Sequence, residues 1–308
     1  MGLLRTVFLK ASQSPWLSHQ VTHRRFAQRA VQRFMPGETL DAALGAAQRF
    51  AGLGMPTVLT ELGENVANAD DARATTRHYV ELLDRIAALK VPAHVSVKPT
   101  HLGLDLSREL CKEQLVTLAK HAARTGTCVM VDMEGSAYVD PTLELYRGLR
   151  AAHNNVGVCL QAYLHRTPQD LESLLPLAPT IRLVKGAYNE PPSVAIPRKR
   201  DVDARYLELA QRLMAATPRP PQPHAFGTHD LTLIERLCAH ARSAGVPNGA
   251  FELQMLYGIK SAAQERLARS GYTMRVLISY GSYWFPWYMR RLAERPANVW
   301  FVVKSLLG

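Results

Sequence analysis

The chain has 308 residues, of which 47% are hydrophobic and 20% charged, and its formal net charge is +11. This length allows one large domain or two small ones, and the composition excludes a disordered chain. The positive charge would suit nucleic acid, anionic lipid or an acidic small molecule. Because the basic residues are scattered and form no nucleic-acid-binding motif, we do not expect nucleic acid as a partner.

The first 37 residues contain arginine and lysine but no aspartate or glutamate, which imitates a mitochondrial presequence. The opening letters MGLLRT also fit the loose myristoylation pattern. Two segments, 17–33 and 38–53, have a helical pattern. We interpret the N-terminus as basic helices that belong to the fold and touch a membrane surface.

The rest of the chain alternates short β-rich runs with amphipathic stretches, such as 73–90 and 202–216. This alternation predicts βαβ units and a parallel sheet. Eight units favour a closed (β/α)₈ barrel over an open sheet, and no GxGxxG motif follows a strand. We expect one domain, with helices in 1–55 and the barrel in 56–308. The predicted strands are 57–62, 93–98, 128–132, 156–161, 180–185, 224–228, 250–254 and 273–279.

Four cysteines lie far apart and form no CxxC pair, which argues against a disulfide framework and indicates a reducing compartment. No apolar run approaches the roughly 18 residues of a membrane span. The cysteines are Cys111, Cys128, Cys159 and Cys238.

Polar residues end seven successive predicted strands. In a (β/α)₈ barrel the carboxyl ends of the strands form the functional face. One such residue could be a helix cap or a loop hydrogen bond, but seven in phase predict a rim that binds a ligand. These residues are Glu61, Lys98, Asp132, Gln161, Lys185, Thr228 with His229, and Gln254.

The segment WYMRRLAERPAN, residues 287–298, follows the last strand and predicts a helix that ends before Pro296. Arg290 and Glu294 form an i,i+4 pair, whereas Arg291 faces another direction. Such a pair of guanidinium groups suits a carboxylate or phosphate. The alternative is a solvated helix end, where cations favour the negative pole of the dipole.

The rim offers few carboxylates, one plausible histidine and no HxH or HExxH spacing, so we expect no metal. Lys98 or Lys185 could form a Schiff base, as in barrel aldolases. The many donors on the rim instead favour two ligands, one large and multiply anionic, the other small and carboxylated.

Several motifs occur in a familiar order: VSVKPTHLG, VDMEGSAYVDPTLE, LQAYLHR, IRLVKGAYNEP, THD, FELQMLYGI and RRLAERPAN. In these motifs the chain closely resembles monofunctional bacterial proline dehydrogenases. The resemblance covers the N-terminal helices and the whole barrel. It implies a distorted barrel, non-covalent FAD, and oxidation of L-proline to 1-pyrroline-5-carboxylate on the route to glutamate. It also implies a quinone acceptor and a cytoplasmic protein, with or without peripheral attachment to the inner membrane.

The resemblance also assigns roles to residues. It places Lys98, Arg290 and Arg291 at the substrate carboxylate, with Glu294 supporting the arginines. Asp132 matches the active-site aspartate that neutralises and orients the cations. Arg182 matches the arginine beside the reactive flavin nitrogen. Met133, Gln161, Lys185, Gly186, Ala187, Thr228, His229 and Gln254 match flavin contacts, and Tyr188 and Leu256 match the proline pocket or ordinary barrel packing.

One region departs from the family pattern. Where the family usually has RVYVPYG, this chain has RVLISYG, so Leu277 replaces a tyrosine and Ser279 a proline. Trp287 stands in place of a second tyrosine. Because the wall of the pocket is altered, oxidation of a proline analogue such as 4-hydroxyproline is an alternative activity.

Overall fold

The computed structural model describes residues 31–285 and 288–289. Eight parallel strands form a closed barrel in which each strand pairs with the next and β8 pairs with β1. Short runs that contain β-branched residues form most of these strands, and such residues suit a buried parallel sheet. The strands are β1 Thr57–Glu61, β2 Ala93–Val97, β3 Val129–Val131, β4 Val156–Gln161, β5 Thr180–Val184, β6 His224–Gly227, β7 Phe251–Leu256 and β8 Thr273–Tyr280.

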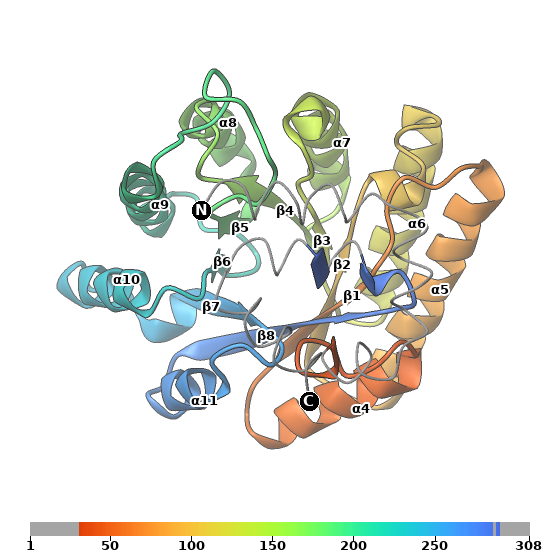
Figure 1. The fold of residues 1–308 in the computed structure, drawn as a ribbon, viewed down its shortest axis with the longest axis horizontal. Coiled ribbons are helices and arrows are strands. Elements are labelled where there is room, and N and C mark those ends of the chain that lie inside the picture. The colour runs from red at the N-terminus through yellow and green to blue at the C-terminus, as the bar shows by residue number, and fades with distance from the viewer. Residues whose placement is uncertain (1–30, 286–287, 290–308) are drawn as a thin grey trace, which may run out of the picture.

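A helix follows each of the first seven strands and packs on the outside of the barrel (Figure 1). Side-chain caps fix several of their starts, as at Asn68, Ser107 and Asp230, each of which accepts a hydrogen bond from a first-turn N–H group. These helices are α5 Ala69–Ala88, α6 Arg108–Arg124, α7 Val139–Ala152, α8 Thr167–Leu174, α9 Lys199–Met214, α10 Leu231–Ser243 and α11 Ser261–Arg269.

The helix α4 (Leu40–Gly52) precedes the barrel in sequence but completes its helical ring. It packs against β8 and β1 and lies between α11 and α5 in Figure 1. In a regular (β/α)₈ barrel the helix after β8 would cover this position.

The fold agrees with the sequence expectation. The closed barrel is confirmed, and the ends of all eight strands lie within two residues of their predicted positions. The helix predicted over 38–53 is α4, whereas most of the helix predicted over 17–33 lies outside the described residues. Within the described ranges, no helix is both long and apolar enough to cross a bilayer.

Candidate active site

A cavity of about 570 Å³ lies at the carboxyl ends of β3 to β8. It gathers thirteen of the residues that the sequence predicted for the site, although they come from six different strands and the loops after them. Those thirteen are Asp132, Met133, Gln161, Arg182, Lys185, Gly186, Ala187, Tyr188, Thr228, His229, Gln254, Leu256 and Leu277.

A buried cation forms the floor of the cavity. Arg182 on β5 is only 4% exposed, and its Nη2 contacts Asp132 Oδ1 and donates to Ser96 Oγ (2.9 Å). Ser96 Oγ donates in turn to the same Asp132 oxygen (2.8 Å). Burial lowers the pKa of Arg182 to about 10, partly offset by the negative charge of Glu252. Arg182 thus stays charged at neutral pH, and its buried Nη1 has no hydrogen-bond partner among the described residues.

Two glutamines of the cavity lining have fixed amide orientations, because their nitrogen atoms are already bound. Gln254 Nε2 donates to Glu252 Oε1 (2.6 Å), and Gln161 Nε2 donates to the Glu134 carbonyl oxygen (2.7 Å). A carboxylate and a carbonyl only accept hydrogen bonds, so both amide orientations are fixed. The two Oε1 atoms are buried and have no partner in the described part of the chain. Each of these oxygen atoms can therefore accept a hydrogen bond from a bound ligand.

A second charged layer lies below this floor. Arg275 Nε on β8 donates to both carboxylate oxygens of Glu252 (2.9 Å each), and its Nη1 donates to the Thr57 carbonyl oxygen (2.9 Å). Glu252 and Arg275 are 4% and 8% exposed. The Arg275 guanidinium group holds the Glu252 carboxylate in place, and that carboxylate in turn fixes the Gln254 amide above it.

Charged residues from three segments meet near the mouth of the cavity. Lys185 Nζ contacts Asp203 of α9 and lies 3.0 Å from Asp230 Oδ2. Lys199 Nζ lies 2.5 Å from Asp203 Oδ2 and 3.3 Å from Asp230 Oδ2. Partial burial alone would raise the pKa of Asp230, but the hydrogen bond and charge of Lys185 lower it to about 2. Lys185 is thus held by ion pairs with two carboxylates.

Gly186 allows the chain to turn at the end of β5. Its φ is +111°, and a Cβ atom there would lie 2.1 Å from the ring of Tyr163. Glycine is therefore required at this position because the backbone lies against the ring of Tyr163. The following loop is tied to its neighbours, since Ile196 N donates to the Tyr163 carbonyl oxygen (2.8 Å) and Glu190 accepts from Ser136.

Two residues of the predicted rim lie outside this lining. Lys98 Nζ donates to the Gly63 carbonyl oxygen (3.0 Å) at the carboxyl end of β2. Glu61 lies 3.8 Å from His78 Nε2, and its backbone N–H donates to Tyr79 Oη (2.9 Å). Burial raises the pKa of Glu61, and the charge of His78 partly opposes this. Glu61 therefore contacts α5 and does not line the cavity.

The residues Arg290, Arg291, Glu294 and Trp287 lie outside the described residues, so their predicted roles stay predictions. Two described residues close to them in sequence, Trp284 and Tyr288, are packed against the segment before the barrel. Trp284 is 1% exposed, and its Nε1 donates to Glu38 Oε1 (2.8 Å). The ring of Tyr288 lies 6.0 Å from that of Phe34.

Sequence reasoning missed several residues of the cavity. Cys159 and Gly227 could have been found by alternation, because they face inward on strands that were correctly predicted. Asp230 ends the THD motif and starts α10, which is the signal of a helix cap. Lys199 and Lys260 carry no such signal, because helix starts with lysine are common on solvated surfaces. The missed residues are Cys159, Val184, Lys199, Gly227, Asp230, Met255 and Lys260.

Comparisons with known proteins agree on one family. The family model described as proline dehydrogenase matches residues 43–304. The chain is 34% identical to "Proline dehydrogenase 2" of Bacillus subtilis subsp. natto over 307 residues, which is 99% of each chain. It is 33% identical over 311 residues to "Proline dehydrogenase" of Deinococcus radiodurans, covering 99% of this chain and 98% of that protein.

Longer proteins share only part of their length with this chain. The "Bifunctional protein PutA" of Escherichia coli (strain K12) is 26% identical, with 88% of this chain and 24% of that protein covered. The crystal structure of proline utilization A (PutA) from Bdellovibrio bacteriovorus has a TM-score of 0.82 at 22% identity. It covers 95% of this chain and 36% of that one, and it supports the fold alone. From the family match and the full-length similarity, the chain belongs to the proline dehydrogenase family.

Proposed function

We propose that this protein oxidises L-proline to 1-pyrroline-5-carboxylate with FAD as its cofactor. The observation that carries the proposal is the buried Arg182 at the floor of a cavity at the carboxyl ends of the strands. A fixed cation in a site of low polarity stabilises negative charge that develops during a reaction. The relatives named proline dehydrogenase supply the substrate.

The residues of the cavity fit a flavin dinucleotide. Its volume of about 570 Å³ lies within the range of cofactor sites. A flavin ring carries both N–H and carbonyl groups, which match the unpartnered Oε1 atoms of Gln161 and Gln254 and the unpartnered Nη1 of Arg182. Lys185, Lys199 and Lys260 also line the cavity and would donate to the diphosphate of a dinucleotide, although Lys185 and Lys199 contact Asp203 and Asp230 in this structure. Met133, Gly186, Ala187, Thr228 and His229 complete the proposed cofactor site.

FAD, when bound, would accept a hydride equivalent from the substrate. In this proposal Arg182 stabilises the negative charge that results, and Asp132 and Ser96 hold its guanidinium group in place. The substrate lies against Tyr188, Leu256 and Leu277, which line the same cavity. Fixing both reactants in one cavity lowers the entropic cost of reaction.

The substrate carboxylate is the second part of the proposal. The family resemblance assigns it to Lys98, Arg290 and Arg291, with Glu294 as support. Bidentate contacts between guanidinium groups and a carboxylate would orient the ring of proline. The same resemblance supports a quinone as electron acceptor, and with it peripheral attachment to the inner membrane of a cytoplasmic protein.

The test is the absorption spectrum of the purified protein. A flavin spectrum that is bleached by L-proline under anaerobic conditions, with FAD released on denaturation, is the expected result. A colourless protein that does not bind added FAD, but is trapped by borohydride with a keto substrate, would instead support a Schiff-base aldolase.

A further inference from the structure

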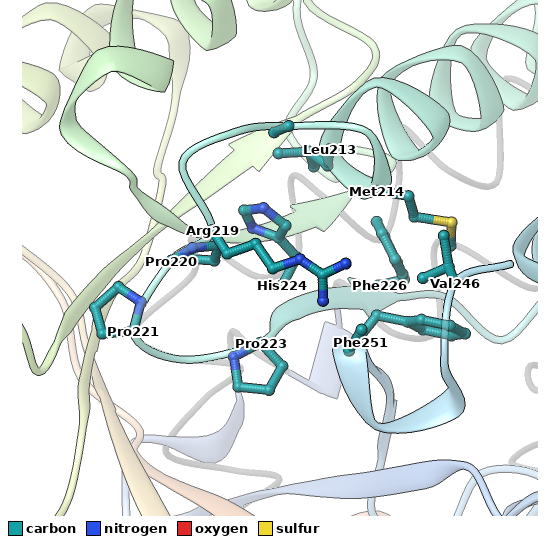
Figure 2. A pocket seen from close by; sticks show the side chains of 12 residues that line it. Leu213, Met214, Arg219, Pro220, Pro221, Pro223, His224, Phe226, Val246 and Phe251 are labelled. Carbon is teal, nitrogen blue, oxygen red and sulfur yellow. The ribbon is translucent and has the colours of Figure 1, made fainter. Parts of the chain in front are cut away.

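A second cavity, of about 230 Å³, lies on the opposite end and outer side of the barrel (Figure 2). It opens beside the first residues of β6 and β7, whereas the candidate active site lies at their carboxyl ends. Its walls are the rings of Phe226 and Phe251, the side chains of Leu213 and Val246, and the proline-rich loop 215–223. The proposed function uses none of these residues.

A buried histidine with one unpartnered nitrogen is part of the lining of this cavity. His224 is 4% exposed, and its Nδ1 accepts a hydrogen bond from the Ile181 N–H (3.3 Å). Burial lowers the pKa of His224 to about 4, so the ring is neutral at physiological pH. A neutral ring whose Nδ1 accepts must carry its proton on Nε2. That Nε2 is buried and has no partner among the described residues, although buried donors are nearly always paired.

A cation lies at the entrance of the same cavity. Arg219 belongs to the loop 215–223, and Figure 2 shows its side chain reaching from that loop toward the space beside Phe226 and Phe251. It is exposed and makes no hydrogen bond or ion pair within the described ranges. Pro218 before it and Pro220 and Pro221 after it restrict the backbone on either side of Arg219. A loop restricted in this way loses little freedom when a ligand binds.

We propose that this cavity binds a small apolar monocarboxylate. One carboxylate oxygen accepts from His224 Nε2, the negative charge lies near Arg219, and the apolar body contacts Phe226 and Phe251. The volume is below the usual range for drug-sized ligands, so the ligand is small. Among the described residues that line the cavity there is no acidic side chain to pair with an ammonium group. Amino acids such as proline are therefore not the ligands of this site.

The test is a titration of the purified, flavin-loaded protein with 4-fluorobenzoate, followed by ¹⁹F NMR. Wild type should bind the probe saturably with a Kd at or below about 1 mM. Arg219→Gln should weaken binding roughly tenfold, because a charge-assisted contact is lost. Val246→Trp should abolish it by filling the cavity. The matched control is Arg200→Gln, since Arg200 has a side chain 93% exposed and lies outside the cavity; it should bind as wild type does.

Two further measurements show where the probe binds. The Nε2 proton of His224 should appear as a slowly exchanging ¹⁵N-coupled signal that shifts with the probe, and 4-fluorobenzylamine should not compete. Binding that persists unchanged in both Arg219→Gln and Val246→Trp, or that L-proline displaces, would belong elsewhere and would overturn the proposal. The absence of saturable binding in wild type would do the same, and would show that water alone satisfies His224.

Discussion

The two faces of the barrel strands bury side chains of different chemistry. On β5, Arg182 points into the barrel and binds Ser96 and Asp132, whereas the next residue, Leu183, is buried in the apolar cluster shared with the helices. On β7, Glu252 and Gln254 face inward, and Leu253 between them belongs to the same apolar cluster. The outward face supplies burial of apolar surface, and the inward face supplies the candidate site.

The inward face should control chemistry. Replacing Arg182 by methionine should lower kcat for L-proline by about 10³-fold, because the fixed cation at the cavity floor is lost. The matched control is Leu183→Met on the outward face of the same strand, which should keep kcat within about twofold. Steady-state kinetics and FAD content of both variants test this. Equal kcat values would remove Arg182 from the mechanism.

The outward face should control stability. Leu183 is 1% exposed, and Leu183→Ala should lower the free energy of unfolding by about 3 kcal/mol through lost burial and a cavity. The kcat of the remaining folded protein should change little at low temperature. Urea denaturation monitored by circular dichroism measures the loss. A large fall in kcat without a fall in stability would contradict the division between the faces.

His224 is a polar exception on the outward side, and it should make stability depend on pH. Its pKa is about 4 in the folded protein against 6.5 for the free side chain, so the unfolded chain binds a proton first as the pH falls. Its contribution is fully present above about pH 6.5 and is lost as the pH falls toward 4, by about 2 kcal/mol at about pH 4.5. His224→Asn should remove that part of the slope.

Denaturation by urea at about pH 7 and at about pH 4.5 measures this difference. The comparison is His165→Asn, a substitution at an exposed histidine, which should leave the wild-type pH dependence intact. An equal slope in wild type and His224→Asn would show that His224 does not contribute to it.

The smallest expected effect concerns the altered wall of the cavity. Leu277 is half-buried at the lining, where the family usually has tyrosine. A rigid ring would pack on the pyrrolidine, so Leu277→Tyr should improve kcat/KM for proline a few-fold, an effect of about 1 kcal/mol. It should leave trans-4-hydroxy-L-proline a poor substrate, because an apolar wall gives its hydroxyl no partner. A wild-type preference for hydroxyproline that tyrosine abolishes would favour the alternative substrate.

The sequence predicted the barrel well because its signals are local. Short β-rich runs and helical spacing decide where each strand begins, and parallel strands then place their carboxyl ends together. Alternation also indicates which residues point inward. Gln161 and Gln254 were predicted as polar residues at strand ends, but the orientation of each amide depends on Glu134 and Glu252.

Other parts of the site depend on contacts distant in sequence. Lys185 was predicted at the rim, yet its partners Asp203 and Asp230 come from α9 and the start of α10. The cavity beside His224 needs the loop 215–223, the end of α9 and the start of β7 at once. No periodic pattern indicates such a meeting. The position of α4 in the helical ring, next to β8, is of the same kind.

The closure of the barrel also affects how the chain folds during synthesis. The pairing of β1 with β8, the hydrogen bond from Arg275 to Thr57, and that from Trp284 to Glu38 join residues far apart in sequence, 218 and 246 positions apart for the two hydrogen bonds. During synthesis β1 and α4 leave the ribosome long before β8 is made. Until then, the edge of β1 that pairs with β8 and the face of α4 that packs against β8 are uncovered. Contacts of such separation slow folding and expose unpaired strand edges. Chains that end before β8 should therefore accumulate as aggregates rather than as partly active enzyme.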